Sequence, residues 1–169
     1  LIRGGGDRWK EFLKVDLINN DTVVYIDSLD FNWKGNDIFV SSLTFSKNGK
    51  KILIGTDKEK LWRYSNKATY FVYNIKSRKL FPVSARNKNL RNVKFSPNGK
   101  YVSYVRDDNN IYVFNTKSLK EKQLTRTGNE KILNGHFGWL YEEELTGYDG
   151  YRWSPDSKYI SFWEEDQTM

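Results

Sequence analysis

Cysteine is absent from this 169-residue chain, which excludes both a disulfide framework and a thiolate metal site. The only histidine is His136, so no group of ligands with the spacing of a zinc site exists. The sequence also has no G-x-S-x-G nucleophile elbow, no P-loop, no dinucleotide fingerprint and no apolar run of about 18 residues. We therefore expect no metal, no cofactor, no transmembrane helix and no catalytic apparatus within the chain itself.

Aromatic residues, in contrast, are plentiful. They make up 16% of the chain, and apolar residues as a whole make up 38%, which is enough for a packed interior. Aromatic and β-branched side chains fit a pleated, half-buried surface better than they fit a helix. The composition therefore favours an all-β domain.

The net charge of +7 is unevenly distributed. Residues 139–169 hold eight acidic and two basic residues, so residues 1–138 carry +13. Many lysines of the longer part fall in turns such as 46–51 and 116–120, where they serve mainly to solvate the chain. We therefore expect no nucleic-acid partner, whose binding would weaken steeply with salt.

A short motif occurs three times along the chain. Each copy is a strand that ends in an aromatic residue, then a turn of the Ser-Pro-Asn-Gly type, then a second strand. Gly and Asn accept the positive φ that such turns need, so each copy predicts a β-hairpin. The aromatic residue returns after 50 and then 58 positions, and the copies are Leu43–Lys50, Val93–Lys100 and Tyr151–Lys158.

Further strands follow each copy of the motif, giving up to four strands in a unit of about 40 to 50 residues, which is the signature of β-propeller blades. The expected strands are 13–16, 23–26, 51–55, 70–74, 79–83, 101–105, 111–115, a weak one at 123–125, and 159–163.

The predicted architecture is thus a partial β-propeller of four-stranded antiparallel blades over residues 1–169. Because a propeller has typically about 4 to 8 blades, we expect the chain to be a piece of something longer. Residues 57–68 and 127–150 interrupt the pattern, and such interruptions of a regular scaffold often carry binding residues. The expected segments are the end of one blade (1–40), two blades (41–84 and 85–126), an inter-blade insertion (127–150) and the start of another blade (151–169).

Three adjacent carboxylates, Glu142, Glu143 and Glu144, lie in the second interruption, where we expect about two turns of helix over residues 138–145. A run of acids is often only a solvated helix face. Here large apolar residues surround it, and apolar packing around acids is costly unless the charge has a purpose. Two clustered carboxylates could accept the three donors of an ammonium group.

The first interruption contains Trp62-Arg63. This pair either covers a blade surface or presents a guanidinium fork to a carbonyl or carboxylate oxygen. His136, between two small or apolar neighbours in the second interruption, is expected to be a loop residue.

These residues together resemble the N-terminal β-propeller of the dipeptidyl peptidase IV family, over roughly residues 40–165. Two residues depart from the family pattern: Gly138 stands where Asp is common, and Gly147 where a small polar residue is common. The motifs that carry the resemblance are Asn134-Gly135, Trp139 to Glu144 and Trp153-Ser154-Pro155 for the glutamate region, with Lys60 to Ser65 and Tyr70 to Asn74 for the arginine-bearing blade.

The resemblance implies roles for three residues. The second and third glutamates of the family motif, here Glu143 and Glu144, hold the free α-amino group of a peptide substrate, and the matching arginine, here Arg63, bonds a substrate carbonyl. A peptide α-amine, with a pKa of about 7.7–8.0, is largely protonated near neutral pH, so paired carboxylates can select a chain terminus. Fixing the terminus then decides which peptide bond reaches a nucleophile elsewhere.

The resemblance also implies the wider setting. The parent would be a serine-type dipeptidyl peptidase that releases N-terminal dipeptides, preferably after proline or alanine, in a periplasmic, extracellular or membrane-anchored location. Its Ser, Asp and His triad would lie on a C-terminal α/β-hydrolase domain outside these residues. The implied partners are a peptide with a free N-terminus, that hydrolase domain, and a second copy in a homodimer.

Two alternatives stay open at this point. The propeller could be a non-catalytic binding scaffold, or the parent could be an inactive homologue that has kept the propeller and lost the nucleophile. A G-x-S-x-G motif in the downstream coding sequence would favour the enzyme.

Overall fold

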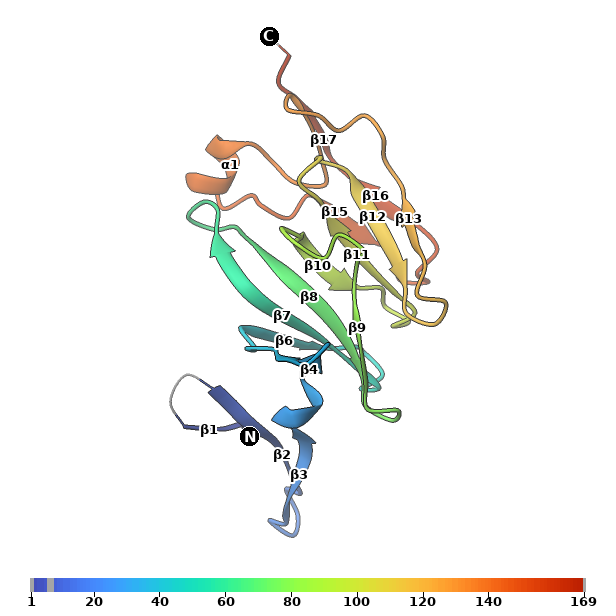
Figure 1. Cartoon of the computed structure of the whole chain (residues 1–169). Coiled ribbons are helices and arrows are strands. Elements are labelled where there is room, and N and C mark those ends of the chain that lie inside the picture. The colour runs from blue at the N-terminus through green and yellow to red at the C-terminus, as the bar shows by residue number, and fades with distance from the viewer. Residues whose placement is uncertain (1, 6–7, 169) are drawn as a thin grey trace.

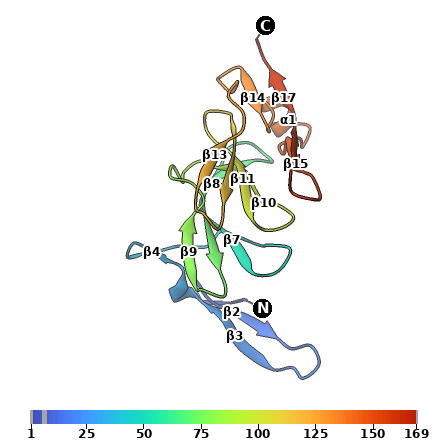
Figure 2. The ribbon, with the colours of Figure 1, turned by 90° about the vertical axis from the view of Figure 1, so that its right-hand side faces the viewer.

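Antiparallel sheets follow one another along the chain and stack into an elongated molecule whose termini lie at opposite ends (Figure 1). The computed structural model describes residues 2–5 and 8–168, with side chains described from residue 12 onward apart from residue 28. Viewed from the side, the sheets rise one above the other from the N-terminal to the C-terminal end (Figure 2).

The sheets have simple, sequential orders. The first has three strands in the order β1-β2-β3: β1 (Ile2–Gly5), β2 (Arg8–Val15) and β3 (Thr22–Asp27). A 3-10 turn, η1 (Ser28–Asp30), and a small hairpin of β4 (Asn32–Trp33) and β5 (Asn36–Asp37) follow. The next sheet has four strands, β6 (Ser42–Phe45), β7 (Lys51–Lys60), β8 (Asn66–Asn74) and β9 (Lys79–Pro82).

The second four-stranded sheet comprises β10 (Arg91–Phe95), β11 (Tyr101–Val105), β12 (Ile111–Asn115) and β13 (Glu121–Gln123). Beyond it lie β14 (Ile132–Asn134), α1 (Trp139–Glu143), β15 (Tyr151–Trp153), β16 (Ile160–Phe162) and β17 (Glu164–Asp166). The all-β prediction with a short helix in the acidic segment is confirmed, and the structure contains two four-stranded antiparallel sheets.

The repeated hairpin turns owe their shape to one serine. In the three copies the hydroxyl of Ser46, Ser96 or Ser154 accepts a hydrogen bond from the backbone N–H five residues later, at 3.0, 3.0 and 2.9 Å. The residue three after the serine takes positive φ: 65° at Gly49, 66° at Gly99 and 64° at Ser157. The sequence motif therefore encodes a self-contained turn, which explains why it marks each blade so clearly.

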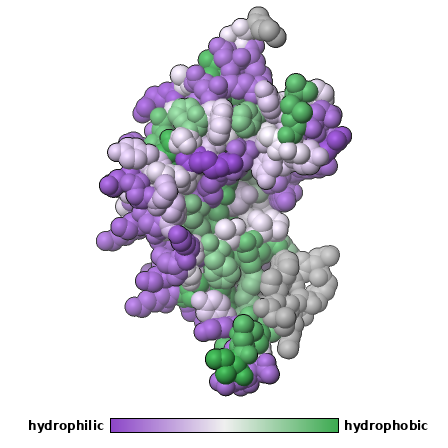
Figure 3. Space-filling model, turned by 180° about the vertical axis from the view of Figure 1, so that it is seen from behind, coloured by the Kyte–Doolittle hydropathy of each residue, from purple (hydrophilic) through white to green (hydrophobic). Residues whose placement is uncertain are grey.

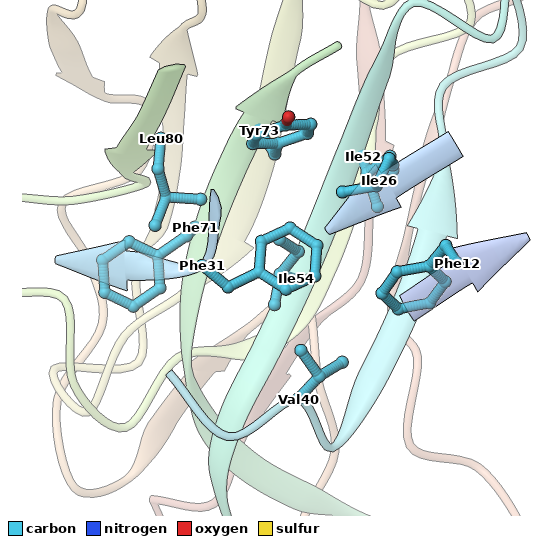
Figure 4. Close-up of a cluster of buried hydrophobic side chains, with 9 residues drawn as sticks. All are labelled: Phe12, Ile26, Phe31, Val40, Ile52, Ile54, Phe71, Tyr73 and Leu80. Carbon is cyan, nitrogen blue, oxygen red and sulfur yellow. The ribbon is translucent and has the colours of Figure 1, made fainter. Parts of the chain in front are cut away.

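Three apolar clusters join the sheets in series. One packs the first sheet against the β6–β9 blade (Figure 4), and its members are Phe12, Ile26, Phe31, Val40, Ile52, Ile54, Phe71, Tyr73 and Leu80. A second lies between the two blades and includes Leu53, Val72, Leu90, Val102 and Tyr104. The third packs Val105 and Ile111 against Tyr151 of the following sheet. Each blade is therefore buried on both faces, as expected for stacked blades.

Three details differ from the sequence expectations. Residues 57–68, expected to interrupt the blade, instead extend β7 and β8 into a long hairpin. The fourth strand of the second blade is Glu121–Gln123 and not 123–125. The insertion 127–150 contributes β14, which pairs with β17 from the next segment. The first two outcomes are set by pairing between neighbouring strands, β7 with β8 and β12 with β13, whereas β14 depends on β17, which lies beyond α1 and the β15–β16 hairpin.

Seen from behind, hydrophilic residues predominate over the upper part of the molecule, and a hydrophobic group stands out at the foot, the end that carries the β2–β3 turn (Figure 3). Leu17 and Ile18 of that turn are 91% and 90% exposed. Within the described ranges no helix is long and apolar enough to cross a membrane.

Candidate functional site

The long β7–β8 hairpin carries the turn with Arg63 out to helix α1, and Figure 1 shows the two side by side. The extension follows a bulge between Thr56 and Glu59, where Asp57 has a φ of 50°. Pairing resumes beyond the bulge with Glu59 opposite Lys67, whose charged ends lie 3.3 Å apart. A bulge bends a strand and increases its twist, so this one redirects the end of the hairpin.

Two glycines close the base of the loop that holds α1. The backbone N–H of Gly150 donates to the carbonyl of Gly135 at 3.1 Å, so the chain returns to the point from which it left. A Cβ at Gly150 would lie 2.7 Å from the Gly135 carbonyl carbon and 2.8 Å from the His136 nitrogen, both backbone atoms. Gly135 itself has a φ of 75°. Glycine is thus required at both ends of the loop.

Helix α1 is a single turn, shorter than the two turns expected. The N–H of Glu142 donates to the carbonyl of Gly138 at 3.2 Å, and the N–H of Glu144 to that of Leu140 at 3.0 Å. Gly138 offers no side-chain cap, but its own N–H donates to a carboxylate oxygen of Glu165 at 2.9 Å. An acid from β17 therefore anchors the start of the helix.

Arg63 and Glu143, predicted to act together, do meet in space. The backbone N–H of Arg63 donates to Glu143 Oε2 at 2.6 Å, and Arg63 Nε lies 3.4 Å from Glu143 Oε1. The arginine side chain is 53% exposed and that of the glutamate 24% exposed. A carboxylate and a guanidinium that are 80 residues apart in the sequence thus lie together at one solvent-accessible surface site.

Glu144, the third predicted site residue, follows directly at the end of the helix and is exposed. Within the part of the chain that the structure describes, its carboxylate forms no ion pair. Apolar side chains that are 38–53% exposed surround these charges on the two elements: Trp62 and Tyr64 on the hairpin turn, and Trp139, Leu140 and Tyr141 on α1. The structure therefore brings Arg63 and Glu143 together beside partly exposed apolar side chains, and Glu144 follows Glu143 in the chain.

Glu142, the first glutamate of the run, has a different environment. It is fully buried, and its Oε2 accepts a hydrogen bond from the hydroxyl of Ser65 at 2.5 Å. Its other oxygen accepts a bond from Nη2 of Arg91, the first residue of β10. His136 Nδ1 lies 3.6 Å from the same oxygen. We call Glu142, Arg91, His136 and Ser65 the buried cluster.

His136 contacts groups on both of its ring nitrogens. Nδ1 lies 3.0 Å from Arg91 Nη1, which can only donate, and 3.2 Å from the carbonyl oxygen of Phe137, which can only accept. Nε2 lies 2.8 Å from Asn109 Oδ1. The imidazole therefore links the cluster to the turn after β11.

The pKa directions indicate the charge of each group in the cluster. Burial lowers the pKa of His136, and the positive charge of Arg91 lowers it further, against the opposing effect of Glu142. Burial alone raises the pKa of the Glu142 carboxyl, but His136, Arg91 and Ser65 outweigh it and hold that pKa below its ordinary value. The cluster thus consists of a carboxylate, a guanidinium and a neutral imidazole.

The lowered pKa of His136 predicts a pH-dependent stability. Below about pH 6.5 the imidazole is protonated in the unfolded chain but still neutral in the native protein. The free energy of unfolding therefore decreases as the pH is lowered, by up to about 1.4 kcal/mol per pH unit. His136 is the only histidine, so it should dominate this slope between pH 7 and 5.5. Urea unfolding across this range should show it, and His136→Gln should flatten it. Equal slopes in the two proteins would contradict the assignment.

Sequence reasoning missed the buried cluster. It treated the acidic run as one unit and His136 as a loop residue. His136 is in a loop, but it is 2% exposed. Arg91 gave no signal because it lies at the start of an ordinary strand, 51 residues from Glu142. The available signal was the number of glutamates: the run has three, and only two were needed to hold an ammonium group.

The comparison with protein families decides the identity of the chain. The family model described as "Dipeptidyl peptidase IV (DPP IV) N-terminal region" matches residues 46–169, which include the hairpin turn, α1 and the acidic run. The chain belongs to this family. The resemblance inferred from the motifs is thereby confirmed.

Known members and a solved structure agree with the assignment to the dipeptidyl peptidase IV family. Probable dipeptidyl-aminopeptidase B of Talaromyces stipitatus is 31% identical over 180 residues, which cover 100% of this chain and 20% of that protein. The protein of the same description from Neosartorya fischeri is 33% identical over 181 residues, covering 99% and 19%. The chain therefore spans about a fifth of the length of these relatives.

Structural comparison gives the same picture. The crystal structure of Porphyromonas gingivalis dipeptidyl peptidase 4 matches 98% of this chain and 24% of its own, with 26% identity and a TM-score of 0.84. The structure of TolB from Acinetobacter baumannii matches 99% of this chain and 35% of its own at 16% identity and a TM-score of 0.51, a likeness of fold alone. The predicted partial β-propeller is confirmed.

Proposed function

We propose that this chain is the substrate-recognition segment of a larger serine-type dipeptidyl peptidase. In this proposal Glu143 and Glu144 hold the protonated α-amine of a peptide, and Arg63 bonds a carbonyl oxygen of the same peptide. The observation that carries the proposal is the meeting of Arg63 with Glu143, 80 residues apart in sequence, at a solvent-accessible site.

The chemistry of the three groups suits a peptide terminus. An ammonium has three donors, and a carboxylate oxygen has two lone pairs, so Glu143 can bond an amine while it keeps its contacts with Arg63. Arg63 faces Glu143 through its backbone N–H and Nε. Its terminal nitrogens, which bond no other side chain among the described residues, are available for a carbonyl oxygen.

Selection of the terminus would set the site of cleavage. An internal amide has no positive charge to offer these carboxylates, whereas a free N-terminus does. A peptide held by its first residue presents the bond after its second residue to a nucleophile at a fixed distance, which is catalysis by positioning. We place that nucleophile on a C-terminal α/β-hydrolase domain of the parent protein, since the chain spans about a fifth of its relatives.

The test uses the full-length protein and two matched substrates: a dipeptide anilide with a free α-amine and its des-amino analogue, in which hydrogen replaces the amine. Each charge-assisted bond to the amine contributes about 1.5–3 kcal/mol, so kcat/KM for the des-amino compound should be at least about 10- to 100-fold lower. An N-acetylated substrate, which is bulkier and equally uncharged, should react at least as poorly. Equal kcat/KM for the first two compounds would refute the proposal.

A further inference from the structure

We propose that Arg91 is a positioning residue for peptide recognition: through the buried cluster it sets the direction in which α1 presents Glu143 and Glu144. This inference rests on the proposed function and extends it to a residue that cannot itself touch the peptide. Arg91 is 8% exposed and Glu142 is fully buried, so neither can contact the amine directly.

Arg91 bridges two segments of the loop that leads into and through α1. One terminal nitrogen donates to the carboxylate of Glu142 on the helix, and the other donates to Nδ1 of His136, which precedes the helix. The guanidinium is planar and its donors are fixed in a fork, so both links hold at once only in one orientation of the loop. Its anchor is β10, a strand of the second blade.

Rotation of the helix is thereby fixed. Successive residues of an α-helix point about 100° apart, since 3.6 residues complete a turn. When Glu142 is held inward by Arg91, Glu143 and Glu144 must point in other directions, and both are in fact more exposed. Without the contact between Arg91 and Glu142, the one-turn helix could rotate, and the carboxylates of Glu143 and Glu144 would no longer point toward the same ligand.

The same carboxylate also fixes the other half of the site. Glu142 Oε2 accepts the bond from Ser65, whose carbonyl in turn accepts the N–H groups of Leu61 and Trp62 at 3.1 and 3.4 Å. These bonds define the turn that contains Arg63. The Arg91–Glu142 pair is thus linked to both recognition elements, the turn of the β7–β8 hairpin and helix α1.

The decisive variant is Arg91→Lys in the full-length protein, which keeps a positive charge beside Glu142 but loses the two-pronged fork. Its matched control is Arg106→Lys. Arg106 is equally buried and pairs with Glu121 in the same blade, but belongs to none of the recognition elements. The quantity measured is the amine preference, defined as kcat/KM for the free-amine dipeptide anilide divided by that for its des-amino analogue.

We expect Arg91→Lys to lower the amine preference about 10-fold, within the range of couplings found between contacting residues, mainly through KM of the free-amine substrate. Arg106→Lys should leave the preference unchanged even if it lowers the melting temperature. Glu142→Gln, which keeps the side-chain shape, should act like Arg91→Lys. It provides a second route if the arginine variant folds poorly.

A double-mutant cycle separates positioning from a merely structural role. Because Arg91 acts through Glu143 and Glu144, Arg91→Lys should change the preference much less in a protein that already carries Glu143→Gln. An equal loss of kcat/KM on both substrates, with or without Glu143→Gln, would overturn the inference and leave the proposed function standing. If Glu143→Gln alone leaves the preference unchanged, the proposed function fails and this inference fails with it.

Discussion

Replacing both Glu143 and Glu144 by glutamine is expected to lower kcat/KM for a free-amine dipeptide substrate by about 10²- to 10⁴-fold, since two charge-assisted bonds of about 1.5–3 kcal/mol each are lost. Glutamine preserves the shape of each side chain and removes its charge. The amine would then face two neutral amide groups, each of which accepts through its oxygen but also presents an NH2 group that can only donate. Arg63 would also lose the carboxylate beside its Nε.

The measurement is steady-state kinetics of the full-length protein, with a control that makes the same chemical change elsewhere. Asp21→Asn with Glu130→Gln also removes two exposed carboxylates, neither of which lies on α1 or on the β7–β8 hairpin. That control should retain nearly full activity, and the glutamine pair at 143 and 144 should react with the des-amino substrate almost as well as the unmodified protein does. An unaltered rate on the free-amine substrate would contradict the assignment of both residues.

Glu142→Ala is expected to lower the free energy of unfolding by about 3–5 kcal/mol, although it removes only one side chain of the same acidic run. The change leaves the guanidinium of Arg91 buried without a counter-charge and the hydroxyl of Ser65 without its acceptor. Water cannot easily replace these bonds, because both neighbouring side chains are buried.

Chemical denaturation of the chain measures this loss of stability. Two further variants serve as controls. Glu144→Ala, an exposed neighbour, should shift the free energy of unfolding by no more than about 0.5 kcal/mol. Glu142→Leu combined with Arg91→Met removes both charges and should recover most of the stability, since an apolar pair often replaces a buried ion pair without cost. Equal effects of Glu142→Ala and Glu144→Ala would show that Glu142 is not buried as described.

Much of the fold could be read from the sequence because its determinants are local. The Ser46, Ser96 and Ser154 turns hold themselves together with bonds inside a few residues, so the repeat that marks each blade is visible without any long-range information. Alternating apolar residues then gave the strands on either side. The acidic run and Arg63 were recognisable because their residue types and order resemble a known family.

The remaining features are not contained in the local pattern of residues. Strand pairing continues beyond the bulge near Asp57 and lengthens the β7–β8 hairpin, and β14 becomes a strand only because the distant β17 lies beside it. The division of labour within the acidic run was equally hidden. Which glutamate points inward is decided by Arg91 and Ser65, on two other elements, and no pattern of adjacent residues records that choice.

The tie between Gly135 and Gly150 has a consequence for protein engineering. A loop that leaves and re-enters its scaffold at a single point looks like a cassette that could be transplanted into another propeller. Transplantation would move the acids but leave behind Arg63, Ser65 and Arg91, which belong to the host blades. A functional graft must therefore carry the hairpin turn and the start of β10 along with the loop.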